Sequence, residues 1–325
     1  MIYIQGYSVN SYIWSNKRMD VGMKKLTVLK SKFLWIAGLV ALGLLISVSL
    51  FAKKTKTPVL RFGMITDVHY AARDHFKERY YNQSLRKLSE FINVMNKEKV
   101  DFIVELGDFK DQDAVPNEAN TLGYLTDVEA VFHQFKGPTY HVLGNHDMDG
   151  ITKTQFLERV ENTGIAKDKN YYSFNQKGFH FIVLDGNYTA DEKDYNKDNY
   201  TGVLSYIPAR EVEWLKEDLK SNQLPAIVFI HQLLDDSKGM KRSAQNAPEV
   251  RKIMEDSGKV LCVFQGHVNS EKYSMINNIH YYSFISTVFG SGLKHNSYVI
   301  VDVFKKGTMK INGYREASSL KLLSH

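Results

Sequence analysis

Five short polar motifs contain the side chains best suited to chemistry, and each follows an apolar, β-branched run. The motifs are Asp67-Val-His69, Gly107-Asp108, Gly144-Asn145-His146-Asp147, the single His231 and Gly266-His267. Short apolar runs bounded by polar residues are typical of buried strands. The carboxyl ends of parallel strands share one edge of an open α/β sheet, where ligands bind. We therefore expect the five motifs to meet at that edge.

The side chains gathered there would be imidazoles, carboxylates and an amide, which are the ligands that divalent cations prefer. Oxygen and imidazole donors suit hard and borderline ions. One carboxylate can also bridge two such ions, about 3.5–4 Å apart. The sequence therefore predicts a centre for two divalent metal ions.

The order and spacing of the motifs resemble those of the calcineurin-like metallophosphoesterases, over roughly residues 60–315. The resemblance rests on Asp67-x-His69, Gly107-Asp108-x-x-Asp111, Gly144-Asn145-His146-Asp147, His231 and Gly266-His267-x-Asn269. Each short motif is weak alone, whereas the ordered set is specific. Flanking segments such as Phe62–Tyr70 and Phe181–Asp185 are most similar to the manganese-dependent ADP-ribose/CDP-alcohol diphosphatases. The class III cyclic nucleotide phosphodiesterases share the same skeleton.

The resemblance implies a role for each metal-ligating residue. The implied ligands are, for the first ion, Asp67, His69 and Asn269; for both ions, Asp108; and for the second ion, Asn145, His231 and His267. Asn269 is a departure, because the family usually has a histidine at this position. An amide oxygen is the weaker ligand, so the first ion would be labile or shifted towards Mn²⁺ or Mg²⁺. A water could instead fill this position, or one tightly held ion could suffice.

The resemblance also assigns catalytic roles to His146 and Asp111. His146 would face the substrate and either protonate the leaving oxygen or stabilise charge on the transferred phosphoryl group. Asp111 would orient His146 and keep its imidazole cationic. The two metal ions would acidify a water, giving a hydroxide that attacks phosphorus in line. Gln112 occupies a position where the Ser/Thr phosphatases have a phosphate-binding arginine, which argues against a protein phosphatase.

These roles predict a hydrolase that cleaves a phosphodiester or pyrophosphate bond in a small phosphorylated or nucleotide-like substrate. The cofactors would be two ions of Mn, Fe, Zn or Mg, with Mn favoured. One alternative is a phosphomonoesterase of the same fold. Another is a membrane-tethered, non-catalytic binding protein with a degenerate site.

Two long polar segments, residues 185–201 and 234–245, are candidates for substrate recognition. Tyr188, Tyr195 and Tyr200 could stack on a base or a sugar. A mobile polar surface loop is an equally good interpretation of these segments.

Several other polar residues have structural explanations. Lys238, Lys241 and Arg242 could meet a phosphate, although exposed basic clusters are usually only solvated. Asp185 could cap a turn or touch the site. Single histidines at strand ends are more often hydrogen-bonded than metal-bound, and four are interpreted as structural on this ground: His133, His141, His180 and His280.

The elements that must position the motifs alternate between strand and helix patterns, which indicates βαβ units and a mostly parallel sheet. Strands are expected at 60–66, 101–106, 139–143, 171–175, 178–185, 226–230 and 260–265, with antiparallel-looking strands at 280–286, 297–304 and 309–314. Helices are expected at 79–97, 122–135, 208–221 and 248–256. The family resemblance implies a four-layer α/β-β/α sandwich with two mixed sheets, over residues 60–316 with a C-terminal tail at 317–325.

The N-terminal region has the pattern of a membrane segment. Residues 33–52 form a run of 20 residues without a charge, long enough to cross a bilayer as a helix. A basic tail (1–32) precedes it and a linker (53–59) follows, and residues 1–22 could be a mis-called extension before Met23. We expect a membrane anchor with the catalytic domain exported to the periplasmic or extracellular side; secretion after signal cleavage is the alternative.

The charge distribution gives no indication of a nucleic-acid partner. The formal charge is +6, but residues 1–60 hold nine basic residues and one acidic residue. The remaining 33 basic and 35 acidic residues leave the domain near neutral. Cys262 is the only cysteine, so no intramolecular disulfide is expected.

Overall fold

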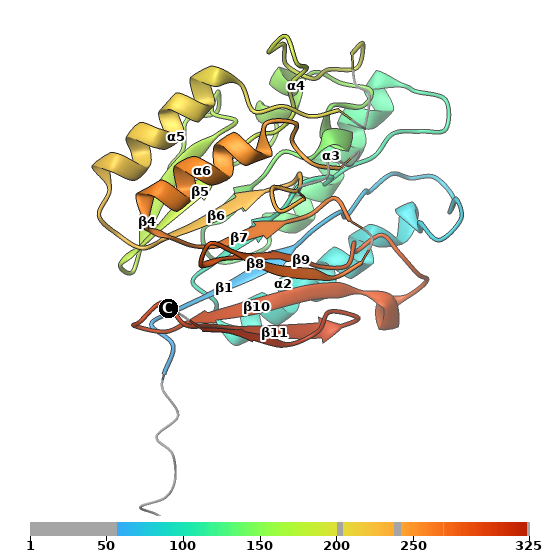
Figure 1. Ribbon diagram of the computed structural model, residues 1–325. Coiled ribbons are helices and arrows are strands. Elements are labelled where there is room, and N and C mark those ends of the chain that lie inside the picture. Colours follow the sequence, from blue (N-terminus) through green and yellow to red (C-terminus); the bar gives the residue numbers. More distant parts are fainter. Residues whose placement is uncertain (1–56, 200–203, 237–241, 269, 324–325) are drawn as a thin grey trace, which may run out of the picture. The chain divides into compact units, whose positions relative to one another are not determined.

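Two mixed sheets form the centre of the domain (Figure 1). The computed structural model describes residues 57–199, 204–236, 242–268 and 270–323. The first sheet consists, in spatial order, of β12 (Leu320–Leu322), β11 (Met309–Arg315), β10 (Ser297–Val303), β1 (Leu60–Ile65), β2 (Phe102–Glu105) and β3 (Thr139–His141). The second consists of β4 (Tyr172–Gln176), β5 (Phe179–Val183), β6 (Ala226–Ile230), β7 (Val260–Gln265), β9 (Ile279–Ser283) and β8 (Lys272–Ile276).

Strand direction explains why the motifs converge. β1, β2 and β3 are mutually parallel in the first sheet. β5, β6, β7 and β9 are parallel in the second. Antiparallel pairing adds β10, β11 and β12 on one side of the first sheet, and β4 and β8 at the two edges of the second. The polar motifs therefore leave β1, β2 and β3 in one sheet, and β6 and β7 in the other, at carboxyl ends.

Helices cover the outer face of each sheet, and the inner faces pack on each other. The helices are α2 (Ser84–Glu98), α3 (Glu118–Phe132), the short α4 (Lys153–Leu157), α5 (Ala209–Ser221) and α6 (Ala247–Ser257). The inter-sheet core is strongly aromatic, as in the stacked rings of Phe62 and Phe102, whose centroids are 5.0 Å apart. Separate apolar clusters join α2 and α3 to the first sheet, and α5 and α6 to the second. The predicted sandwich with two mixed sheets is confirmed.

Local sequence sets where these helices begin and end. Leu88, Phe91 and Met95 of α2 are fully buried, in agreement with their helical spacing. α2 begins at Ser84 and not at the predicted 79, because Arg79 pairs in extended backbone with Phe289. A 3₁₀ turn, η1 (Tyr81–Gln83), then leads into the helix.

Three details of the predicted strands are wrong. β8 was not predicted, although Asn277 and Asn278 both adopt the positive φ of a tight hairpin turn between β8 and β9. β9 looked antiparallel from the sequence; it is antiparallel to β8, but with its other neighbour β7 it pairs in parallel. The expected tail at 317–325 contains β12, which pairs with β11.

The predicted basic tail at 1–32 and membrane anchor at 33–52, with most of the linker, lie outside the described residues. Among the helices that the structure does describe, none is both long and apolar enough to cross a membrane.

Candidate metal centre

The structure brings the predicted acids and histidines together in three groups, of which one contains His69, Asp111 and His146 and the other two share a carboxylate. Of these two, one contains Asp67, His69 and Asp108, and the other contains Asp108, His231 and His267. Within each group the potential ligand atoms all lie within 4.8 Å of one another. Asp108 is nearly central, because its Oδ2 lies 3.4 Å from Nε2 of His69 and 3.2 Å from Nε2 of His231. This is the arrangement expected of a bridging carboxylate between two ions.

Backbone conformation turns these side chains towards a common centre. Asp67, His69, Asp108 and His267 have φ of 52°, 47°, 58° and 68°, in the left-handed region that non-glycine residues rarely adopt. Each such residue costs about 1–3 kcal/mol unless its surroundings enforce it. Hydrogen bonds between the motifs do so, including Asp67 N to Gly107 O at 3.0 Å and His69 N to Asp108 O at 2.8 Å.

Two motif glycines are required by close packing. A Cβ at Gly144 would lie 2.1 Å from the backbone nitrogen of Asp108, and one at Gly266 would lie 2.4 Å from Thr66 Oγ1. Both distances are shorter than side chains tolerate. The Gly-Asn and Gly-His pairs in the sequence therefore reflect strand ends that approach one another with no space for a side chain.

His231 is oriented as a ligand. It is fully buried, and its Nδ1 donates a hydrogen bond to the Leu106 carbonyl at 2.7 Å. This hydrogen bond leaves Nε2 as the atom that faces Asp108, and within the described part of the chain Nε2 has no hydrogen-bond partner. Metal-bound histidines usually anchor the second ring nitrogen in this way. The buried donor set and this inward-facing nitrogen fit divalent cations.

The backbone around Asp108 is fixed by Asp147, the last residue of the third motif. The buried carboxylate of Asp147 accepts hydrogen bonds from the backbone nitrogens of Asp108, Phe109 and Gly144 at 2.8–3.0 Å. Burial and the nearby Asp108 carboxylate raise the pKa of Asp147 to about 6. Asp147 thus ties two ligand-bearing loops together and does not itself point at the centre.

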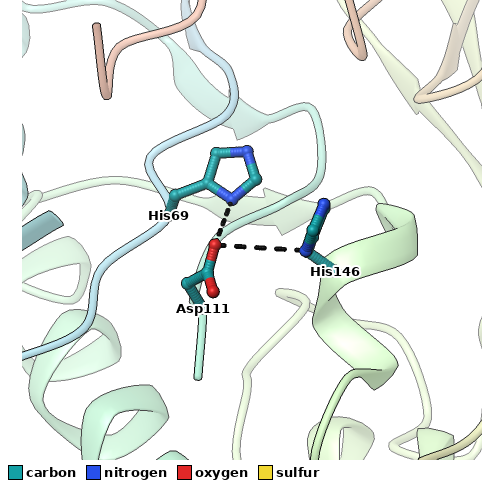
Figure 2. A group of neighbouring side chains, drawn as sticks. All are labelled: His69, Asp111 and His146. Atoms are coloured by element: carbon teal, nitrogen blue, oxygen red, sulfur yellow. Dashed lines mark hydrogen bonds and ion pairs between the residues drawn. The ribbon is translucent and has the colours of Figure 1, made fainter. Parts of the chain in front are cut away.

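His146 lies at the solvent-facing side of the centre, beside His69 (Figure 2). Its side chain is 24% exposed, and its backbone nitrogen donates to Asp108 Oδ1 at 2.7 Å. The predicted partner Asp111 is 4.0 Å from His146 Nδ1, but Asp149 is closer, at 2.8 Å. Asp111 instead lies 3.0 Å from Nδ1 of His69 and 3.0 Å from Nη2 of Arg73. The predicted orienting role of Asp111 thus passes mainly to Asp149.

Asp149 is held in turn by a buried lysine. Lys110 pairs with the Asp149 carboxylate and donates to the His146 carbonyl at 2.6 Å. Sequence reasoning missed Asp149, Lys110 and Arg73. The signal for Asp149 was its spacing of three residues after His146, which places it at the C-terminal cap of the short helical turn η2 (Asn145–Met148), where its backbone nitrogen donates to the His146 carbonyl.

The other predicted residues have varied positions. Asn145 is buried at the start of η2, next to His146 in the sequence, whereas Asn269 lies outside the described residues. Asp185 accepts a hydrogen bond from Asn187 N at 2.9 Å and pairs with Lys153 at 2.7 Å, so it caps a turn.

The predicted substrate tyrosines do not fit that role where they are described. Tyr188 and Tyr195 are each only 1% exposed and belong to the interior, so neither can stack on a substrate. Tyr200, Lys238 and Lys241 lie outside the described residues. The four histidines interpreted as structural each lie near protein groups: His133 and His141 near Glu129, His180 near Asp218 and His280 near Tyr273 and Leu323.

The candidate ligand histidines differ in the direction of their pKa shifts. Burial is the largest single effect and lowers the pKa of His69 and of His231. The neighbouring carboxylates together outweigh it, Asp108 most strongly, and raise the two pKa values to about 9 and about 10. Burial and the neighbouring His231 lower the pKa of His267 to about 3. Without metal, His69 and His231 therefore hold a second ring proton at pH 7, and His267 does not.

Metal uptake should release protons from His69 and His231. An imidazole must be neutral to bind a metal, so loading at pH 7 should release about two protons per chain, and Mn²⁺ affinity should rise up to about 100-fold per pH unit between pH 6 and 9. Calorimetry of Mn²⁺ binding in buffers of different ionisation enthalpy would count these protons. An affinity that does not change over this pH range would contradict the two pKa values.

The fold and this centre define a metallophosphoesterase. The model of the calcineurin-like phosphoesterase family matches residues 60–270, and the chain belongs to that family. The predicted enzyme class, a metal-dependent phosphoester hydrolase, and the two-metal cofactor are both confirmed.

Individual proteins with similar sequences or folds show which members of the family this chain resembles. A manganese-dependent ADP-ribose/CDP-alcohol diphosphatase from Oryza sativa subsp. japonica is 28% identical over 138 residues, which span 40% of this chain and only 42% of the rice protein. A protein of the same name from Xenopus laevis is 23% identical over 301 residues, spanning 73% and 83% of the two chains. A dimetal phosphatase from Danio rerio has the same fold, with a TM-score of 0.71, 18% identity and coverage of 82% and 100%.

Proposed function

We propose that this enzyme hydrolyses the pyrophosphate bond of a nucleoside-diphosphate-linked substrate, with manganese as the preferred metal. The observation that carries the proposal is a pocket of about 560 Å³ beside His146 and Asp111, which is lined by three basic side chains and by aromatic rings as well as by acidic side chains. The names of the diphosphatase relatives support the same substrate class and the same metal.

The pocket has groups for both parts of such a substrate. Arg73, Lys77 and Arg79 line it and supply positive charge for the phosphate that is not attacked. Phe76 is 64% exposed and also lines the pocket, with Phe289, so a nucleobase could stack there. A phosphomonoester has no second phosphate to use the basic side chains. The pocket therefore favours a pyrophosphate over a monoester.

The residues of the chain divide the chemistry between them. Asp67, His69, Asp108, Asn145, His231 and His267 would hold the two cations. These cations, when bound, would lower the pKa of a water and supply a nucleophile near neutral pH. His146, oriented by Asp149, is placed to donate a proton to the leaving oxygen or to stabilise charge on the phosphoryl group.

A substrate panel tests this proposal. With Mn²⁺ present, ADP-ribose and CDP-choline should be hydrolysed with a kcat/KM well above that of bis-p-nitrophenyl phosphate, and p-nitrophenyl phosphate should be the poorest substrate. A preference for p-nitrophenyl phosphate would indicate a phosphomonoesterase. No turnover of any of the four with Mn²⁺, Fe²⁺, Zn²⁺ or Mg²⁺ would leave the degenerate binding protein as the better interpretation.

A further inference from the structure

Lys87 of α2 is a buried lysine whose ammonium group is surrounded by backbone carbonyl oxygens. Its side chain is 1% exposed, and Nζ donates to the carbonyls of Thr287, Phe289 and Gly290 at 2.7, 2.7 and 2.8 Å. The carbonyl of His295 lies 3.3 Å from Nζ. Among the described residues no carboxylate forms an ion pair with Lys87, although buried lysines usually have one.

Burying a charged ammonium group costs free energy, because the group loses its hydration. The hydrogen bonds to the carbonyl oxygens must compensate for this loss. Burial lowers the pKa of Lys87 to about 8, with Glu316 acting in the opposite direction, so the group is still largely protonated at pH 7. A buried ammonium that lacks hydrogen-bond acceptors would be far less favourable. Rings of backbone carbonyls are also what potassium channels use to replace the hydration shell of K⁺.

The segment that supplies these carbonyls also forms one wall of the substrate pocket. Phe289 lines the pocket, and the guanidinium of Arg79 lies 5.8 Å from the centre of its ring. The backbone of the segment also forms hydrogen bonds with the residues on either side of Arg79. Tyr80 N donates to Val288 O at 2.9 Å, and Gly290 N donates to Glu78 O at 2.9 Å.

The same segment contacts the metal centre. Val288 N donates to the carbonyl of Asp67 at 3.1 Å, and Thr287 N donates to the carbonyl of Thr66 at 3.1 Å. Asp67 is one of the ligand residues with a left-handed backbone. A shift of residues 287–290 would therefore move the pocket wall and release one of the contacts that hold Asp67 in place.

We infer that the four carbonyls form a monovalent-cation site which the Lys87 ammonium permanently fills, and that this tethered cation holds the pocket wall in position. Without a cation, the four carbonyl oxygens would lose their common hydrogen-bond donor and their dipoles would repel one another, so the segment would move apart. Lys87 is thus a positioning residue that acts on substrate through Phe289 and Arg79. Its effect on substrate rests on the proposed function, whereas the cation site itself does not.

The test is whether an external cation replaces the missing ammonium. Lys87→Ala should melt at a lower temperature than the wild type in tetramethylammonium chloride, an ion too large for the site, and should regain stability in KCl at equal ionic strength in a saturable way. Lys87→Met, which fills the space without a charge, should be destabilised and should show no such recovery. Lys97→Met is the matched control, because Lys97 is exposed on the same helix, and it should behave as the wild type in both salts.

Kinetics provides the second measurement. For Lys87→Ala in tetramethylammonium chloride, KM for the best substrate of the panel should rise by about tenfold with a smaller change in kcat, and KCl should restore it. If the panel shows no activity at all, the proposed function fails, and potassium-dependent melting of Lys87→Ala still decides whether the cation site exists.

Two results would overturn the inference. One is a Lys87→Ala variant that keeps the wild-type melting temperature and KM in tetramethylammonium chloride. The Lys87 ammonium would then not be needed to hold the pocket wall in position. The other is a destabilised Lys87→Ala that responds equally to the two salts, which would reduce Lys87 to a packing residue. If Lys87→Ala does not fold in tetramethylammonium chloride, refolding in KCl supports the site, and failure to refold in either salt counts against it.

Discussion

Replacement of Asp108 by asparagine should lower turnover by at least about 10³-fold and reduce the bound metal from two ions per chain to one or none. Asp108 is the only described residue shared by the Asp67 group and the His267 group, with Oδ2 within 3.4 Å of two histidine nitrogens. The amide keeps the shape of the side chain but removes the negative charge that two neighbouring cations require. Both ions should therefore be affected by this single change.

Elemental analysis of the purified variant, together with kcat/KM, checks this result. Asp127→Asn is the matched control, because Asp127 is exposed on α3 and belongs to none of the ligand groups. It should keep both its metal and its activity. Full metal content and full activity in Asp108→Asn would show that the two groups do not share a bridging ligand.

His146→Ala should lower turnover by roughly 10²–10⁴-fold while the metal content stays at the wild-type level. His146 faces the pocket and is not a member of either group that shares Asp108. Its loss should therefore remove proton transfer or charge stabilisation and leave the ions bound. Loss of metal in this variant would instead identify His146 as a ligand. His133→Ala, at a side chain that is 49% exposed, is the control.

Two further substitutions separate the partners of His146. Asp149→Asn should change the pH dependence of kcat, because Asp149 is 2.8 Å from Nδ1 of His146. Asp111→Asn should mainly weaken the first ion, because Asp111 contacts His69. If only Asp111→Asn changed the pH dependence of kcat, Asp111 would be the orienting residue after all.

The strands and their motifs could be predicted from the sequence because each is a local signal. An apolar run such as Ala226–Ile230 is buried wherever it pairs, and the polar residue that follows it must leave the sheet at one edge. The family resemblance then related five local signals to one centre. The left-handed backbone of Asp67 and His267 is not visible in the sequence, because it results from bonds between distant loops.

The incorrect predictions share a physical cause, which is that tertiary packing decides them. Tyr188 and Tyr195 are in a polar segment, yet both are buried, and Tyr188 contacts Lys153 and Asn170. β9 pairs in parallel with β7 and antiparallel with β8, and this placement of β9 between two strands is decided by the assembled sheet. The pocket cations were missed because Arg73 and Arg79 resemble ordinary surface charges until Phe289 is placed beside them.

The left-handed backbone at four ligand residues has a consequence for how metal is acquired. Because the protein fold already fixes these torsions, the binding site is preorganised before the ions bind. Exchange of one divalent ion for another can then proceed without local refolding. Which ion occupies the enzyme in vivo therefore depends chiefly on donor chemistry and on the supply of each metal.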